Sequence, residues 1–385
     1  MKRIYLDNAA TTKINEELFE YMLPYMKEEF GNASSIHSFG RTAKVILEEA
    51  RETVAEFIGA NPKEIFFTNG GTESNNFALK GLAFSHLNSS KKNHIITSST
   101  EHLAVLDTLA YLSDIFNFKI TYLKPDSNGR LDTDKIESSI TSGTFLISVM
   151  HSNNEIGVIN DIDVISGIAA DKGIYVHTDS VQSIGKTYFN VKESGVNFAT
   201  LSAHKIYGPK GIAALYVKDK TPVHKFIHGG KQERDMRGGT ENIASIAGFK
   251  KVVELLKENF SKDVNHYLNL KKHSEKSLAE NFGDAVLFNS KEEKSLPNIL
   301  NISFDNTKTE YDSEMLLIKL DLKGIAVSGG SSCTSGTHQP SHVLTELGRD
   351  RMTALGSLRI SFGRENTIEE TDYLTECLKE IVKVK

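Results

Sequence analysis

The sequence predicts an α/β protein with a large unit, built on a mainly parallel sheet covered by helices, and a smaller α+β unit. Short apolar runs alternate with helical patterns from about residue 15 to residue 240. This alternation is typical of parallel sheets, because each parallel strand needs a crossover connection, usually a helix. Further strand-like runs follow a long helical pattern nearer the C-terminal end. At 385 residues, the chain can form two or three structural units with a sizeable core.

The composition is that of an ordinary globular protein, with 39% hydrophobic and 25% charged residues. The formal net charge of −5 gives no basic footprint for nucleic acid. No apolar run approaches the roughly 18 residues of a membrane span. The opening residues, MKRIYLDNAATT, lack the apolar stretch of a signal peptide. We therefore expect a cytoplasmic protein with no membrane segment and no direct contact with nucleic acid.

The first motif with a chemical meaning is a strand, a turn and a helix within residues 64–81, EIFFTNGGTESNNFALKG. Residues 65–68 read as a buried strand, Gly70, Gly71 and Thr72 as a tight turn, and Glu73 as the start of a helix. Glycines and a helix N-terminus together favour anion binding, with a phosphate as the expected ligand. Neither a Walker A loop nor a dinucleotide fingerprint is present. An ordinary strand-turn-helix corner is the alternative.

Two further strand-like runs end in polar residues. The run over 94–102 ends at His102, a candidate to lie flat against a cofactor ring, or a structural hydrogen-bonding histidine. The run over 144–150 leads into HSNNEIG, in which Asn154 can hydrogen-bond a ring substituent or simply make a turn.

The next two strand-like runs carry a carboxylate and a lysine. Asp179 ends the run over 173–179, and Lys205 follows the run over 198–201 in SAHKIYGPKG. Asp179 lies 26 residues before Lys205, which allows a crossover and a parallel return, so both side chains should emerge at one sheet edge. Lys205 is a candidate Schiff-base lysine for pyridoxal 5′-phosphate (PLP), with Asp179 as partner of the ring nitrogen and Gln182 near the ring. A surface lysine and a helix-capping aspartate are the alternatives.

The C-terminal part begins with a helical pattern from Ile243 to about Leu256, with apolar residues on one stripe. It bridges to the smaller unit, which we expect to start near Asp263. Strands of that unit are predicted over residues 298–304, 324–329 and 357–363.

The two cysteines lie in different settings. Cys377 falls in an amphipathic helical pattern over 373–382, where it should pack inertly. Cys333 lies in VSGGSSCTSGTHQP, a Gly/Ser-rich loop that exposes a candidate nucleophile. An incidental surface cysteine is the alternative. The two cysteines suggest no disulfide framework. No metal site is expected, because C-x-x-C and H-E-x-x-H are absent and the pair His224 and His228 lacks site-like neighbours.

These segments together resemble the cysteine desulfurases of the NifS/IscS type, which are fold-type-I PLP enzymes of the class V aminotransferase superfamily. The resemblance runs nearly end to end and keeps the family order of ten motifs: YLDNAATT (5–12), FGNASSIHSFGR (30–41), FTNGGTESNN (67–76), TEH (100–102), HSNNEIG (151–157), HTDSVQSIGK (177–186), SAHKIYGPKG (202–211), GGKQERDMRGGTEN (229–242), SGGSSCTSG (328–336) and LRISFGR (358–364).

The resemblance implies a role for each matching residue. It implies that Lys205 carries the cofactor and moves protons at the substrate carbon, that Cys333 is the catalytic cysteine, and that Arg359 clamps the substrate carboxylate. His102 would stack on the ring and act as an acid/base, and Asn32 would help to hold the substrate. The remaining implied cofactor-binding residues are Gly71, Thr72, Asn154, Asp179, Gln182, Ser202, His204 and Thr240. Thr240 is expected to reach the partner subunit's phosphate, which implies a homodimer. The family pattern implies a large PLP domain over residues 13–260 and a small domain made of 1–12 and 261–385.

The sequence departs from the family pattern at a few positions. Lys231 and Asp235 stand where the family usually has small residues, and Thr337, His338 and Gln339 replace a more usual Ser-Leu-Glu. These departures bear on loop motion and on the choice of sulfur acceptor, not on a core chemical role.

The implied reaction converts L-cysteine into L-alanine and a persulfide on Cys333. The sulfur would then pass to an acceptor protein, either an iron–sulfur scaffold or a tRNA- or cofactor-thiolation factor. A selenocysteine lyase is the closest alternative, and a non-catalytic sulfur-assembly scaffold that retains the PLP fold is another.

Overall fold

The computed structural model describes residues 3–87, 91–290, 292–329, 331–332 and 339–385. Its centre is a sheet with the strand order β2-β8-β7-β6-β5-β3-β4. β8 is antiparallel to both of its neighbours, and the other pairings are parallel. The strands of this sheet are β2 (Ile65–Thr68), β3 (His94–Ser98), β4 (Lys119–Leu123), β5 (Thr144–Ser148), β6 (Tyr175–Asp179), β7 (Phe198–Ser202) and β8 (Ala213–Val217).

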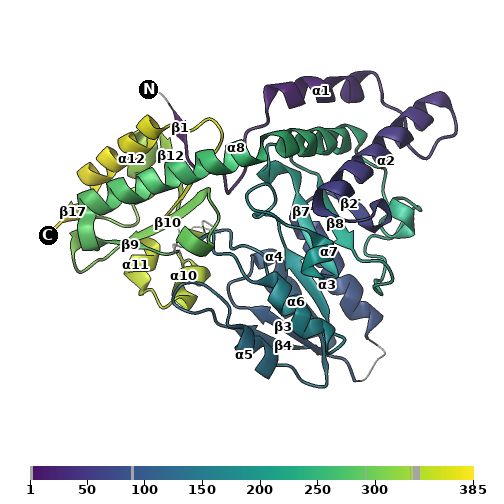
Figure 1. The fold of residues 1–385 in the computed structure, drawn as a ribbon, viewed down its shortest axis with the longest axis horizontal. Coiled ribbons are helices and arrows are strands. Elements are labelled where there is room, and N and C mark those ends of the chain that lie inside the picture. The colour runs from purple at the N-terminus through teal and green to yellow at the C-terminus, as the bar shows by residue number, and fades with distance from the viewer. Residues whose placement is uncertain (1–2, 88–90, 291, 330, 333–338) are drawn as a thin grey trace.

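Helices cover both faces of this sheet (Figure 1). On one face, α3 (Gly71–Ser85) and α4 (Leu103–Phe116) pack on Phe66, Phe145 and Leu215. The other face packs against a larger core contributed by α1 (Glu16–Lys27), α2 (Ser38–Ile58), α5 (Thr133–Ser138), α6 (Ile162–Ala170), α7 (Val191–Ser194) and the first half of α8 (Ile243–Phe282). Because both faces are covered, the inner strands β5, β7 and β8 are buried along their whole length.

α8 is one continuous helix of 40 residues, which is longer than the pattern to about Leu256 predicted. Between Gly248 and Gly283 the sequence has neither glycine nor proline, so nothing ends the helix. Its buried stripe continues through Tyr267, Leu270 and Leu278, where it packs against a second core. Figure 1 shows α8 running from the large sheet to the C-terminal elements.

The second core surrounds an antiparallel sheet with the order β13-β16-β10-β9. The elements of this part are β9 (Val286–Phe288), β10 (Ile299–Phe304), β13 (Ser328–Gly329), β16 (Leu358–Ser361), α9 (Leu316–Leu322), α10 (His342–Glu346), α11 (Arg351–Leu355) and α12 (Ile368–Ile381). Three small pairings complete it: β1 (Ile4–Tyr5) with β12 (Ile325–Ala326), β11 (Thr309–Glu310) with β17 (Lys383–Val384), and β14 (Ser331–Ser332) with β15 (Gln339–Pro340). Short 3₁₀ turns occur at η1 (Pro62–Glu64), η2 (Ala203–Lys205), η3 (Glu233–Asp235), η4 (Gly283–Ala285) and η5 (Glu292–Lys294).

The strand predicted over 324–329 is divided in two. β12 pairs in parallel with the N-terminal strand β1, whereas β13 pairs antiparallel with β16. The N-terminal segment therefore belongs to the second core, where Ile4 and Leu6 are buried. Beyond Leu6 this segment continues toward the large sheet, and its backbone contacts Lys205.

Two features are absent from the part of the chain that the structure describes. In that part of the chain no helix combines the length and the apolar character that crossing a bilayer requires. Within the same residues, no three histidine, cysteine, aspartate or glutamate side chains cluster as metal ligands would.

Candidate active site

The carboxyl ends of the central strands surround a cavity of about 300 Å³. Ten of the residues singled out from the sequence line it: Gly71, Thr72, His102, Asn154, Asp179, Gln182, Ser202, His204, Lys205 and Arg359. An adjoining hollow of about 770 Å³ opens at the N-terminus of α3 and shares Gly71, Thr72, Ser202 and His204 with the cavity. Of these two cavities, only the smaller one is lined by Lys205, Asp179 and Arg359 together.

Lys205 lies in the 3₁₀ turn that follows β7. Its Nζ donates hydrogen bonds to the backbone oxygens of Ala9, at 2.6 Å, and Ala10, at 2.8 Å. Burial and the nearby Arg359 guanidinium lower the pKa of the Lys205 amine to about 8. A fraction of the amine is therefore unprotonated near neutral pH, the form in which a lysine attacks a carbonyl carbon.

Asp179 ends β6, which pairs in parallel with β7 as the spacing predicted. Its Oδ2 accepts a hydrogen bond from Asn75 Nδ2 at 2.7 Å, and its Oδ1 accepts one from the Val181 backbone N–H at 3.0 Å. A carboxylate has about four acceptor positions, so Asp179 keeps capacity for a further donor in the cavity.

The N-terminus of α3 and the end of β7 form a cradle for an anion. The first backbone N–H groups of a helix have no partner within that helix, and those of Gly71 and Thr72 lie at the cavity wall. Ser202 is buried, and its Oγ has no hydrogen-bond partner among the described residues. Burial and nearby Lys205 lower the pKa of His204 to about 4, so its ring is neutral. These donors fit the phosphate of PLP.

His102 caps the N-terminus of α4 and lines the cavity. Its Nδ1 accepts a hydrogen bond from the Ala104 backbone N–H at 3.0 Å. A neutral ring that accepts at Nδ1 carries its proton on Nε2, so the cap fixes both the ring orientation and the tautomer.

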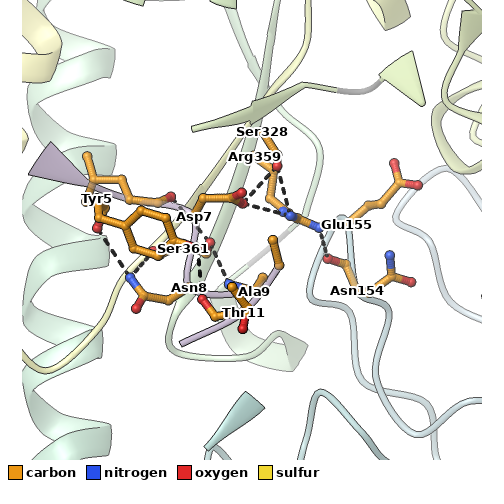
Figure 2. A network of polar contacts seen from close by, with 12 residues as sticks. Tyr5, Asp7, Asn8, Ala9, Thr11, Asn154, Glu155, Ser328, Arg359 and Ser361 are labelled. Carbon is orange, nitrogen blue, oxygen red and sulfur yellow. Dashed lines mark hydrogen bonds and ion pairs between the residues drawn. The ribbon is translucent and has the colours of Figure 1, made fainter. Parts of the chain in front are cut away.

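Arg359 lies on β16 and is held by three partners (Figure 2). Nη2 donates to Asp7 Oδ1 at 2.8 Å and to Ser328 Oγ at 3.1 Å, and Nη1 donates to the Asn154 backbone oxygen at 3.0 Å. Its Nε is buried without a partner in the described part of the chain. The guanidinium is thus oriented by the protein and retains donor capacity for a carboxylate.

Two residues singled out from the sequence, Asn32 and Thr240, do not line this cavity, and a third is not among the described residues. Asn32 is exposed and accepts a hydrogen bond from the Ser34 backbone N–H. Thr240 is exposed, between η3 and α8. Cys333 lies outside the described residues, directly after β14. Cys377, by contrast, is buried in α12 as predicted.

Among the departures from the family pattern, Asp235 forms an ion pair with Lys225 at 2.7 Å. Both Lys231 and Asp235 are exposed, and His338 lies outside the described residues.

Sequence reasoning missed several contributors to the site. Asn75 lies four residues after Gly71 in α3, on the same helix face, and this spacing is the one signal that points to it. Asp7 belongs to a recognised motif, but no pattern connects it with Arg359. The carbonyl oxygens of Ala9 and Ala10 have no side-chain signature at all.

Acidification should destabilise the protein through its buried histidines. Burial lowers the pKa of His151 and of His177 to about 4, while an unfolded histidine titrates near 6.5. Between these values the unfolded state binds more protons, so stability rises with pH across this window and is lost as pH falls through it. At pH 5 each histidine should lower the free energy of unfolding by about 2 kcal/mol.

The melting temperature of the cofactor-free protein, measured between pH 7 and pH 4.5, checks this expectation. His151 contacts Ser183 and Phe189 and does not line the cavity, so the His151→Phe variant serves as the comparison. Its melting temperature should fall less steeply than that of the wild type, and parallel curves would contradict the assignment.

Comparison with known proteins supports the same chemistry. The family model described as "Aminotransferase class-V" matches residues 4–374. The cysteine desulfurase IscS of Dictyoglomus turgidum is 44% identical over 384 residues, covering 100% of this chain and 95% of that protein. The protein of the same name from Clostridium botulinum is 43% identical over 383 residues, covering 99% and 95%.

Two solved structures extend the similarity to three dimensions. One, titled "NIFS-LIKE PROTEIN", has a TM-score of 0.90 and 38% identity, covering 98% of this chain and 99% of its own. Another, titled "SspA in complex with cysteine", has a TM-score of 0.79 and 35% identity, covering 94% and 99%. The similarity therefore spans both cores and the cavity between them.

Proposed function

The chain belongs to the class-V aminotransferase family and is a PLP-dependent cysteine desulfurase, and from this premise we propose which residues carry the reaction. The observation that supports the assignment is the joint lining of one cavity by Lys205, Asp179 and Arg359. When bound, PLP supplies a ring that takes up the electron pair released at the substrate carbon. Lys205 would hold the cofactor, Asp179 would keep the ring nitrogen protonated, and His102 would lie against the ring.

The phosphate is held at the α3 N-terminus by Gly71 and Thr72, together with Ser202 and His204. Asn154 and Gln182 contact the ring substituents; in the structure Gln182 Nε2 also donates to the Ala9 backbone oxygen at 2.9 Å. Thr240 reaches the phosphate site of a second copy, so the protein is proposed to be a homodimer.

The substrate L-cysteine is bound through its carboxylate by Arg359, with Asn32 assisting. The Lys205 amine removes the proton from the α-carbon. The Cys333 thiolate attacks the substrate sulfur, an S–S bond forms, and the carbon–sulfur bond breaks. The electron pair of that bond stays with the β-carbon, which takes up a proton, and the protonated Lys205 amine returns a proton to the α-carbon. The products are L-alanine and a persulfide on Cys333.

The wider setting completes the proposal. Residues 13–260 form the PLP domain, and residues 1–12 and 261–385 form the small domain that carries the cysteine segment. The enzyme works in the cytoplasm and passes its sulfur to an acceptor protein for iron–sulfur assembly or for tRNA or cofactor thiolation.

Intact mass after brief exposure to L-cysteine without reductant tests this function. One added sulfur that maps to the peptide containing Cys333, with release of L-alanine, is the expected result. A PLP-loaded protein that gains no sulfur would contradict it. Parallel assays with L-selenocysteine separate the lyase alternative, because a lyase would release alanine from that substrate alone.

Replacing the proposed carboxylate clamp should mainly weaken substrate binding. Arg359→Ala removes a bidentate, charge-assisted contact, so KM for L-cysteine should rise roughly ten- to hundredfold. Cysteamine, which lacks the carboxylate, should bind equally to both proteins. Arg349→Ala is the matched control, because Arg349 donates to Asn289 Oδ1 and does not line the cavity. The measurement is steady-state kinetics with L-cysteine. An unchanged KM in Arg359→Ala would contradict the assignment.

A further inference from the structure

A row of four buried side chains runs behind the cavity and ends at Asp179. Ser148 on β5 lies 2.8 Å (Oγ to Nδ1) from His177 on β6, and His177 Nε2 lies 3.2 Å from Asn75 Oδ1 on α3. Asn75 Nδ2 in turn lies 2.7 Å from Asp179 Oδ2. Ser148 and His177 are fully buried, Asn75 is 1% exposed and Asp179 is 7% exposed. Hydrogen bonds shielded from water in this way hold their members in one arrangement.

The direction of every hydrogen bond in this row follows from the carboxylate of Asp179, at the end of the row. An ionised carboxylate only accepts, so Asn75 must turn its amide nitrogen toward Asp179 and its carbonyl oxygen toward His177. That oxygen accepts, so His177 must carry its proton on Nε2. Its Nδ1 is then the acceptor, and the Ser148 hydroxyl donates to it. Each hydrogen in the row therefore points toward Asp179.

Two buried ionisable groups, His177 and Glu101, affect the charge around Asp179. Burial lowers the pKa of His177 to about 4, so the ring is neutral and its single proton is fixed by the row. Glu101 also lies near Asp179 and is fully buried, and burial raises the pKa of its carboxyl well above the usual range. Glu101 Oε1 accepts from the Met150 backbone N–H.

We propose that Asn75 and His177 are positioning residues for Asp179, with Ser148 fixing the tautomer of the His177 ring. The row holds the Asp179 carboxylate in one place, where it would face the ring nitrogen of PLP. This inference deepens the proposed function and rests on the role assigned there to Asp179. Its effect falls on the cofactor, because none of the three residues contacts Arg359, the proposed clamp for the substrate carboxylate.

Titration of cofactor-free protein with PLP tests the row independently of turnover. His177→Phe keeps an aromatic ring but removes both nitrogens, and Asn75→Leu keeps a similar volume but removes the donor. The PLP dissociation constant should rise at least about tenfold in each, since each change breaks a chain that ends on a charged group. In loaded enzyme, kcat should fall by a similar factor while KM for L-cysteine changes less than about threefold. His177→Gln retains an N–H donor and should recover part of the loss.

His94→Phe is the matched control. His94 is also a buried histidine of the central sheet, with side-chain hydrogen bonds to Thr144, Thr121 and Thr141, but it begins β3 and does not line the cavity. Its loss should lower the melting temperature and leave the PLP dissociation constant within about twofold. Equal losses of PLP affinity in His94→Phe and His177→Phe would reduce the row to a folding element and overturn the proposal.

The tautomer of the His177 ring can be measured directly in the wild-type protein and tests the hydrogen-bond directions of the row. With ¹⁵N-labelled histidine in the cofactor-free enzyme, the His177 ring should show a protonated Nε2 and an unprotonated Nδ1 between pH 6 and pH 8. The opposite tautomer would contradict the row even if every variant failed to fold. Asp179→Ala distinguishes failure of the proposed function from failure of this proposal. Unchanged PLP affinity in Asp179→Ala would contradict the role of Asp179. Lower PLP affinity in Asp179→Ala with unchanged affinity in His177→Phe would contradict only the role of the row.

Discussion

Replacing Lys205 by alanine is expected to lower the rate of alanine release from L-cysteine by at least about a thousandfold. The amine is held by the carbonyl oxygens of Ala9 and Ala10 at 2.6 and 2.8 Å, and its pKa is lowered to about 8. In the proposed reaction this one group both attaches the cofactor and removes the substrate proton. Alanine offers neither function. The neighbouring His204 cannot replace the lysine, because we assign its neutral ring to the phosphate site.

The measurement is alanine release per PLP-loaded protein, together with the absorbance of the cofactor. Lys205→Ala should still bind PLP weakly through the phosphate cradle but should lose the absorbance of the lysine-linked form. Lys172→Ala is the control, because Lys172 is exposed and pairs with Glu137 on the surface. A Lys205→Ala enzyme that keeps a tenth of the wild-type rate would remove Lys205 from the chemistry.

Replacing Cys333 by serine is expected to leave the PLP content unchanged and to lower alanine release to below about 1% of the wild-type rate. At neutral pH a few per cent of an ordinary cysteine is already thiolate, whereas a serine hydroxyl stays protonated and is a poor nucleophile for sulfur. No persulfide can form on the serine oxygen, so sulfur transfer should stop as well.

Cys377→Ser is the matched control for this change. Cys377 is 2% exposed within α12 and packs in the second core, far in the sequence from any cavity residue except Arg359. It should lose some stability and keep its activity. With L-selenocysteine as substrate, the Cys333→Ser enzyme should retain more of its rate, because selenium leaves carbon more easily than sulfur. Full alanine release from L-cysteine in Cys333→Ser would eliminate the persulfide route.

The parts of the site that could be predicted from the sequence are those that strand ends bring together. Asp179 and Lys205 each follow a recognisable strand, and parallel pairing of these strands places both at one edge. The glycines before α3 were recognisable for the same reason, since a strand and a helix flank them.

The parts that could not be predicted depend on groups that carry no distinguishing side chain or on distant packing. Ala9 and Ala10 act through carbonyl oxygens, which every residue has. Asp7 meets Arg359 only because β1 and β12 pair in parallel and bring the N-terminal segment beside β16. The length of α8 also escaped prediction, because its second half is buried by the C-terminal elements and not by the sheet that the first half covers.

The contacts of the N-terminal segment also set an order of events during synthesis of the protein. Lys205 is held by residues 195 and 196 positions earlier in the chain, and Asp7 meets Arg359 across 352 positions. Such distant contacts form slowly, and only after both partners have left the ribosome. A nascent chain that stops before β16 would already contain the phosphate cradle and Asp179 but would lack the anchor that fixes residues 7–10 over the lysine. Placement of the Lys205 amine against the carbonyl oxygens of Ala9 and Ala10 is therefore coupled to completion of the chain.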